Sequence, residues 1–389
     1  MSEALVWKII AASAEGFLVA VFAGAVVVWL FNNVLTQLRE SPLKKVAPPA
    51  LLPLAALAGA GHGWAAFHDW PRLGLPAWAG LGILLWCGFD AWREAARNRA
   101  AACWELRTAI PAVRTDYMAR QFPQPLLSAL PLNRQGRLRW NRTELPVLSP
   151  QDPGKEVCIV FLADFHLHPF LNTAFFREAI RLALGSEPDI VLLGGDFATK
   201  RAQAGEAAEL LRSFRWPENT FAVRGNHEFW TRPAFFRRAL AEAGIRLLSN
   251  EHHRVRTAGG REVLIAGLED PYIPLTARKE ARLREAIAAE DAEGGRLPRI
   301  GFVHTPESYA RAAAIGCDLV LGGHTHGGQV RLPVFGTTIS SCPVPRRFVY
   351  GRASVNGTMT LTTNGLGAYY GIRWRCPPEI SEVVLTPRL

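Results

Sequence analysis

The sequence predicts a layered α/β domain that is preceded by an N-terminal region of apolar helices. In the second half of the chain, apolar runs of strand length alternate with stretches whose apolar residues recur at helical spacing. Repeated strand–helix units of this kind are typical of a layered α/β core. Histidines and carboxylates follow directly after several of the runs, where ligands gather at the edge of such sheets. The first 92 residues hold seven of the twelve tryptophans and most of the excess of hydrophobic residues.

The composition indicates two regions and a positively charged protein. The chain has 389 residues and a net charge of +10, with a mean hydropathy of +0.06 and a pI of about 9.7. A basic protein can bind nucleic acid, an anionic membrane or an acidic substrate. The arginines cluster just after the apolar region, which favours membrane lipid as a partner; no nucleic-acid-binding module is visible, so nucleic acid is not expected. The six cysteines include no Cys-x-x-Cys pair, which argues against a disulfide framework or a zinc ribbon.

Three apolar stretches in the first 92 residues predict membrane-spanning helices. They run from about 16 to 35, 47 to 67 and 73 to 89, and a helix needs about 20 mostly apolar residues to cross a bilayer. The third stretch is close to the lower limit, and the alternative is that all three are buried helices of a soluble domain. We therefore divide the chain into a transmembrane region of about three helices (1–92), a basic membrane-proximal linker (93–150) and an α/β domain (151–389).

The positive charges that flank these stretches predict their orientation. Lys and Arg are enriched in the cytoplasmic loops of membrane proteins. The loop after the first stretch carries Arg39, Lys44 and Lys45, and the segment after the third carries Arg93 and Arg97. Three crossings then place the α/β domain on the cytoplasmic side.

The α/β domain divides into strands and helices in a regular order. Apolar runs predict strands at 157–163, 189–193, 220–223, 263–267, 299–303, 318–321, 348–355 and 358–363. Helical spacing predicts helices at 173–184, 202–214, 233–243, 276–290 and 306–314. The last two strands flank Asn356-Gly357, which is a strong signal for a two-residue hairpin turn.

Five short segments with metal-ligand side chains follow the ends of these strands. They are Asp164-Phe165-His166, Gly195-Asp196, Gly225-Asn226-His227-Glu228, His304 and Gly323-His324-Thr325-His326. Carboxylates suit hard metal ions and imidazoles suit borderline ones. Two metal ions about 3.5–4 Å apart can clamp and split a phosphate ester. The segments therefore predict a dinuclear metal site that hydrolyses a phosphoester or pyrophosphate.

Spacing suggests a role for each of these side chains. Asp164 and His166 lie two residues apart at a strand end, so both can face one ion, and His326 can reach the same ion. Asp196 is the natural bridge because a carboxylate has two oxygens. The second ion would take the amide oxygen of Asn226 and the imidazoles of His304 and His324. His227 is placed to donate to the phosphate or to protonate the leaving oxygen, with Glu228 as its partner.

The order DxH, GD, GNHE, H and GHTH over about residues 155–386 resembles the calcineurin-like metallophosphoesterase superfamily. The resemblance implies a four-layer αββα sandwich with a dinuclear centre, for which Mn is favoured and Fe or Zn are alternatives. It assigns the same residues to the two ions and places His227 beside the phosphate. One departure is Thr199, which stands where many relatives have the second Asp of a GDxxD segment; this puts the support of the metal ligands in doubt.

Two further segments, 326–329 and 376–380, are similar to a bacterial, membrane-attached branch that includes UDP-2,3-diacylglucosamine diphosphatases of lipid A synthesis. We therefore expect a phosphohydrolase of the bacterial inner membrane, multi-pass, that acts on a phosphorylated small molecule or a lipid-linked pyrophosphate. Arg346 and Arg347 could grip a substrate phosphate, or could be a solvated entry to the hairpin. The alternatives are a broad-specificity phosphodiesterase or phosphatase on soluble substrates, and a non-catalytic metal-binding membrane protein.

Overall fold

The computed structural model divides the chain into two compact units, residues 1–104 with 331–343 and residues 105–330 with 344–389. The residues that it describes are 12–14, 16–20, 23, 112–114, 135, 137–150, 154–167, 171, 173–231, 233–270, 276–331, 338–339, 342, 344–368, 371, 373 and 376–388. In the first unit, residues 12–14, 16–20 and 23 are helical. The second unit contains every site residue that the sequence predicts.

The first sheet of the second unit has seven strands. In spatial order they are β1 (Ala112–Arg114), β2 (Arg137–Leu148), β15 (Glu379–Pro387), β3 (Val157–Leu162), β4 (Ile190–Leu193), β5 (Thr220–Ala222) and β6 (Arg246–Leu247). The strands from β3 to β6 are parallel. The C-terminal strand β15 runs antiparallel to β3 and parallel to β2. The chain end is therefore inserted into the middle of the sheet.

The second sheet has six strands. Their order is β13 (Gly351–Val355), β14 (Thr358–Thr362), β10 (Leu319–Gly322), β9 (Arg299–Val303), β8 (Glu262–Leu268) and β7 (Glu251–Arg256). The four central strands are parallel, and each edge strand is antiparallel to its neighbour. Two further short strands are β11 (Val330–Arg331) and β12 (Thr338–Ile339).

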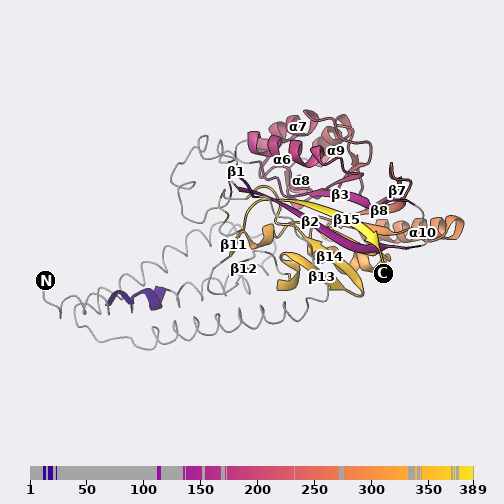
Figure 1. The fold of residues 1–389 in the computed structure, drawn as a ribbon. Helices are drawn as coiled ribbons and strands as arrows, with labels where there is room; N and C mark the ends of the chain where they lie inside the picture. The colour runs from indigo at the N-terminus through magenta and orange to yellow at the C-terminus, as the bar shows by residue number, and fades with distance from the viewer. Residues whose placement is uncertain are drawn as a thin grey trace. The chain divides into compact units, whose positions relative to one another are not determined.

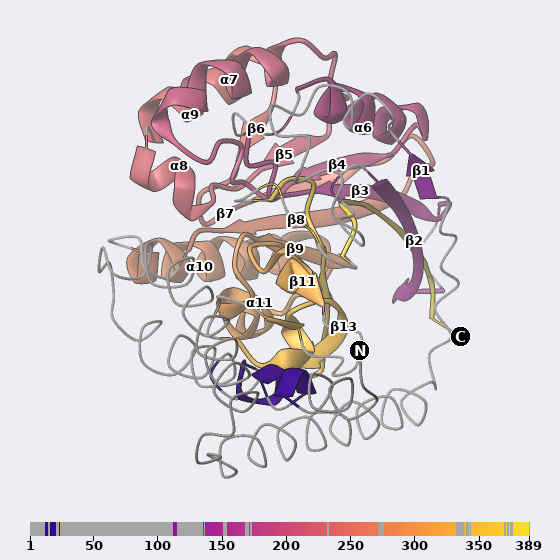
Figure 2. The same cartoon turned by 90° about the vertical axis from the view of Figure 1, so that its left-hand side faces the viewer.

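Helices cover the outer face of each sheet (Figures 1 and 2). The helices of the first sheet are α6 (Thr173–Gly185), α7 (Ala204–Arg212), α8 (Asn226–Thr231) and α9 (Pro233–Glu242), and those of the second are α10 (Thr276–Gly294) and α11 (Tyr309–Ala314). One apolar cluster joins α6, α7 and α9 to the first sheet, a second lies between the sheets, and a third joins α10 and α11 to the second sheet. The layers therefore follow the order helix, sheet, sheet, helix.

The predicted elements of this unit have counterparts in the structure. All eight predicted strands and all five predicted helices are present, with ends displaced by a few residues. Strand β2 was not predicted: residues 137–148 belong to the first sheet, although the sequence placed them in the linker that ends at 150. Its alternation of polar and apolar residues is interrupted by Asn141 and Thr143, which are both buried.

The predicted multi-pass membrane localisation is contradicted by the structure. Of the three apolar stretches, only residues 16–20 and 23 are described. Within the described part of the chain, no helix combines the length and the apolar character of a membrane span. The remainder of the three stretches, and most of the linker at 93–150, lie outside the described residues.

Candidate metal centre

The predicted ligands lie on loops at the carboxyl ends of the parallel strands, where both sheets present their loops to the same edge. The loop after β3 continues beside the loop after β4: the Asp164 amide donates to Gly195 O at 3.0 Å, and the His166 amide donates to Asp196 O at 2.8 Å. These bonds hold the two loops in register past the end of the sheet. As a result, Asp164, His166 and Asp196 face a common space.

Five of the seven predicted ligands have left-handed backbone. Their φ angles are 54° for Asp164, 45° for His166, 56° for Asp196, 69° for His324 and 52° for His326. Residues with a Cβ rarely adopt this conformation because the Cβ approaches the following carbonyl oxygen. It turns each loop sharply, so that side chains two residues apart on a loop reach the same site. Strained backbone of this kind gathers at functional sites.

Neighbouring glycines leave space for the two carboxylates. A Cβ added to Gly323 would lie 2.8 Å from Asp164 Oδ2, and one added to Gly225 would collide with Asp196 Oδ1. The Asp164 carboxylate instead accepts hydrogen bonds from the His324 amide, at 3.0 Å to Oδ1 and 2.9 Å to Oδ2. The loops are therefore packed directly on the side chains that they present.

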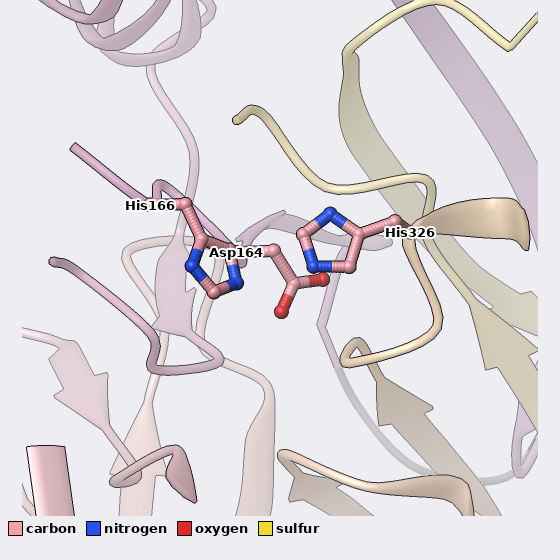
Figure 3. A group of neighbouring side chains, drawn as sticks. All are labelled: Asp164, His166 and His326. Atoms are coloured by element: carbon pink, nitrogen blue, oxygen red, sulfur yellow. The ribbon is translucent and has the colours of Figure 1, made fainter. Parts of the chain in front are cut away.

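One half of the site consists of Asp164, His166 and His326, which we call the Asp164 half. Each offers one ligand atom, and these atoms lie within 4.8 Å of one another. In Figure 3 the Asp164 carboxylate lies between the two imidazole rings, whose centroids are 4.7 Å apart. Asp196 adjoins this half, with its Oδ2 at 3.1 Å from His166 Nε2.

The other half consists of Asn226, His304 and His324, which we call the His304 half. His304 Nδ1 donates to the carbonyl oxygen of Gly194 at 2.7 Å, so its Nε2 faces the site. That nitrogen lies 3.0 Å from Asn226 Oδ1 and 3.1 Å from His324 Nδ1. Asp196 Oδ2 lies 3.3 Å from the same atom. A single carboxylate oxygen thus lies beside both halves.

This donor set fits divalent metal ions. Carboxylate, amide and imidazole atoms converge on one another, and most of them can only accept a hydrogen bond or bind a cation. The carbonyl that holds His304 Nδ1 fixes the tautomer and ring orientation, as is usual behind a metal-ligating histidine. The mixture of oxygen and imidazole nitrogen suits Mn, Fe or Zn and does not select among them.

The electrostatics of the two halves differ. Burial alone would lower the pKa of His304, but Asp196 and Asp164 raise it to about 10. Burial lowers the pKa of His166 to about 4. Burial, together with His166 and Arg373, holds the pKa of His326 well below its usual value. The Asp164 half thus keeps neutral imidazoles, whereas the His304 half attracts positive charge.

The two aspartates also differ from each other. Burial raises the pKa of Asp164 to about 6, with His304 opposing the shift. Burial also disfavours the charged form of Asp196, but His304, His227 and His166 hold its pKa well below the usual range. Asp196 is therefore the carboxylate whose negative charge is the more strongly stabilised by its neighbours.

Glu228 is fully buried and joins the loop of the shared Asp196 to the loop that carries Asn226. Its carboxylate accepts the amides of Asp196 at 2.7 Å, Phe197 at 2.7 Å and Gly225 at 2.9 Å. Burial and the nearby Asp196 raise its pKa to about 7. The sequence predicted Glu228 as a partner of His227; in the structure its hydrogen bonds go to the backbone of the ligand loops.

His227 lies against the Asp164 half. Its amide donates to Asp196 Oδ1 at 2.9 Å, and its Nδ1 donates to Thr199 O at 2.7 Å. The Thr199 hydroxyl also lies 3.4 Å from His166 Nδ1. Thr199, which departs from the family pattern, therefore supports His227 through its backbone and His166 through its side chain. The exposed ring of Trp230 lies beside His227, with centroids 5.4 Å apart.

The structure leaves the predicted substrate contacts at the surface. Arg346 and Arg347 are exposed in a short turn before β13, and the Arg347 guanidinium lies 4.7 Å from the centre of the Phe348 ring. The turn is connected to the ligand loops because Thr325 Oγ1 donates to Val349 O at 2.7 Å. Their contact with substrate remains a prediction.

The sequence did not reveal the C-terminal segment that lies behind the Asp164 half. Residues 363–368 are buried beside Asp164, and the fully buried Arg373 contacts both this segment and His326. The only available signal was the resemblance at 376–380, because no local spacing relates Arg373 to His326.

Comparisons with known proteins found a matching family model and several similar proteins. A family model described as calcineurin-like phosphoesterase matches residues 159–328. The chain is 31% identical over 236 residues to Phosphodiesterase YaeI of Escherichia coli (strain K12), covering 58% of this chain and 81% of that protein. It is 27% identical over 236 residues to the uncharacterized metallophosphoesterase YkuE of Bacillus subtilis (strain 168), covering 58% and 78%. A transmembrane protein with metallophosphoesterase domain from Danio rerio is 29% identical over 255 residues, covering 62% of this chain and 56% of that protein.

Proposed function

Since the chain belongs to the family of calcineurin-like phosphoesterases, hydrolases that act on phosphoesters, we propose that it cleaves phosphodiesters with two divalent metal ions. The residues of the Asp164 half would hold one ion, those of the His304 half would hold the other, and Asp196 would serve both. The observation that carries the proposal is the position of Asp196 Oδ2, 3.1 Å from His166 Nε2 and 3.3 Å from His304 Nε2. One carboxylate oxygen that lies beside the donor groups of both halves is the arrangement that suits a pair of cations.

Each group has a task in this reaction. Bound at these residues, two divalent ions would supply the positive charge that activates water at neutral pH and stabilises the phosphoryl oxygens. His227 lies outside both ligand sets, and its Nδ1–H is engaged by Thr199 O. Its Nε2 is therefore the nitrogen that can hold a proton for the leaving oxygen. Glu228 and Thr199 keep the ligand loops and the His227 ring in place.

A diester is favoured as the substrate class because the E. coli relative that covers most of the α/β domain is named a phosphodiesterase. Cleavage of the pyrophosphate of UDP-2,3-diacylglucosamine is the same kind of reaction. Each of its phosphorus atoms, like that of a phosphodiester, has two oxygens that are bonded to a further group. The similarity of residues 376–380 to that branch supports it as a second substrate to be tested.

The test is a metal-reconstitution assay. The purified protein is treated with a chelator, resupplied with Mn²⁺, Fe²⁺ or Zn²⁺, and given bis(4-nitrophenyl) phosphate, 4-nitrophenyl phosphate or UDP-2,3-diacylglucosamine. We expect two bound ions for each chain and metal-dependent cleavage of the diester that exceeds cleavage of the monoester. The variant His304→Ala should lose activity. The control His252→Ala removes a histidine of β7 that pairs with Glu290 of α10 and should keep activity. A protein that binds two ions and hydrolyses none of the three substrates would overturn the proposal.

A further inference from the structure

Arg373 is the largest fully buried side chain among the described residues, with 0% of its surface exposed. Its guanidinium is bound to backbone carbonyl oxygens: Nε donates to Gly367 O at 3.1 Å, and Nη2 donates to Asn364 O at 2.8 Å and also to Gly367 O. Burying a charged group is costly unless hydrogen bonds replace its solvation. The buried guanidinium of Arg373 therefore indicates a specific structural or functional role for this side chain.

The same guanidinium reaches His326, a ligand of the Asp164 half. Its Nη1 donates to His326 O at 3.4 Å, and its Nη2 lies 3.4 Å from His326 Nδ1. His326 Nδ1 also lies 3.2 Å from Gly367 O, the carbonyl that Arg373 binds. The thiol of Cys376 donates to His326 O at 3.3 Å. Both the backbone and the ring of His326 are thus held from behind.

The carbonyl groups that Arg373 binds belong to a loop that also holds Asp164. The Leu366 amide donates to Ala163 O at 3.0 Å, and the Gly367 amide donates to Asp164 O at 2.6 Å. Arg373 therefore joins two ligands that come from different sheets, Asp164 after β3 and His326 after β10. These contacts of Arg373 all lie behind the Asp164 half.

We propose that Arg373 is a positioning residue for the Asp164 half, an inference that rests on the proposed two-metal function. It presents His326 with Nδ1 toward Gly367 O and Nε2 toward the ion. Partners behind a metal ligand typically contribute about 10- to 100-fold to metal affinity. Its charge acts in the opposite sense, because a buried cation repels the ion. Loss of the forked guanidinium alone should therefore weaken metal binding, whereas loss of the positive charge alone should strengthen it.

The experiment compares R373K, which keeps the charge and loses the forked guanidinium, with R373M, which loses both. Metal-free protein is titrated with Mn²⁺ by calorimetry, and the spin coupling of the bound ions is followed by electron paramagnetic resonance. We expect R373K to weaken one of the two binding steps about 10- to 100-fold and to give the uncoupled spectrum of a single ion. The binding step of the His304 half should stay within about threefold of the wild-type value.

A matched control is R299K. Arg299 is also buried and binds a carbonyl, Ile315 O at 2.6 Å, but it lies at the start of β9, the end opposite His304. R299K should bind both ions as the wild type does. Circular dichroism and thermal unfolding of every variant show whether R373K loses more structure than R299K.

The outcomes separate this inference from the proposed function. If the wild type binds two coupled ions and R373K does the same with unchanged affinity, the positioning role is overturned and the two-metal function stands. If R373K is unchanged and R373M binds more tightly, Arg373 acts only through its charge, which also overturns the role. If both steps weaken equally in R373K while its thermal unfolding falls with them, Arg373 is a general structural residue and the inference is wrong. A wild type that binds no ion pair refutes the proposed function first.

Discussion

The two halves of the site use similar ligands but are supported by different parts of the chain. In the His304 half, the ring of His304 is held by the carbonyl of Gly194, which belongs to the loop of another ligand segment. In the Asp164 half, His326 is held by Arg373 and Cys376, about 50 residues further along the chain. One half is thus assembled by the ligand segments themselves, and the other depends on the C-terminal segment.

The difference extends to charge. Asp196 and Asp164 raise the pKa of His304 to about 10 against the effect of burial, whereas burial, His166 and Arg373 hold the pKa of His326 well below its usual value. A position that attracts a proton this strongly also attracts a divalent cation. The comparison teaches that two sets of similar ligands can have different electrostatics, because carboxylates face His304 whereas the buried Arg373 lies behind His326.

The largest effect is expected at Asp196, which both halves share. The substitution Asp196→Asn removes the carboxylate charge that both halves share, so both ions should be lost or bound more weakly. Metal ions contribute several kcal/mol of charge stabilisation, so kcat/KM should fall by about 1,000-fold or more. The control Asp318→Asn changes a carboxylate paired with Arg296 and Arg388 at the other end of the strands and should keep full activity. If Asp196→Asn kept its activity, the hypothesis that the two halves share the Asp196 carboxylate would be wrong.

His227 should separate chemistry from metal binding, since it belongs to neither half. The substitution His227→Gln should lower kcat about 100-fold or more, because general acid catalysis typically contributes 10²–10⁴-fold. The metal content, measured by plasma mass spectrometry, should stay at two ions. A loss of metal in parallel with activity would instead make His227 a ligand.

A direct measure of the comparison is the stepwise binding of Mn²⁺. We expect two steps about tenfold or more apart, since about 1.4 kcal/mol separates equilibrium constants by that factor. The tighter step belongs to the His304 half, so His304→Ala should remove it, and His326→Ala should remove the weaker step. Two equal steps in the wild-type titration would show that the support behind the ligands does not matter for affinity.

The smallest effect concerns Glu379, which supports the C-terminal loop through the hydrogen bond from its amide to Gly365 O at 3.0 Å. Burial raises the pKa of Glu379, although hydrogen bonds from Ser381 and Tyr350 oppose the shift. The folded protein therefore binds this proton more tightly than the unfolded chain. The resulting stabilisation is fully present below the usual pKa of glutamate and is lost as the pH rises through the higher folded pKa.

Glu379→Gln tests this sign in the metal-free protein. Glutamine stays neutral, so the wild type should lose stability relative to the variant as the pH rises above the usual pKa of glutamate, by roughly 1.4 kcal/mol for each tenfold difference in proton affinity. Urea unfolding over a series of pH values measures the difference. If the free energies of unfolding of the two proteins depend on pH in the same way, the ionisation of Glu379 does not contribute to the stability of the loop behind the Asp164 half.

The sequence predicted the parts of the fold and site whose signals are local. An apolar run such as residues 299–303 predicts a strand, and the polar residue that follows it, His304, then has a defined place at the sheet edge. Strand β15 and Arg373 lacked such a signal. Their positions depend on the chain end returning between β2 and β3, which is a long-range pairing that no short pattern encodes. For the same reason, the sequence identified Glu228 but predicted the ring of His227 as its partner. Side-chain types alone do not show which backbone amides a carboxylate will bind.

The left-handed backbone at five of the ligands also bears on how the protein can change over generations. Each such residue costs about 1 kcal/mol or more relative to a glycine, and natural domains have only about 5–15 kcal/mol of stability in total. A population that no longer needed the reaction would gain stability by replacing His166 or His326 with glycine. We therefore expect a laboratory library selected for thermal stability alone to lose these side chains early.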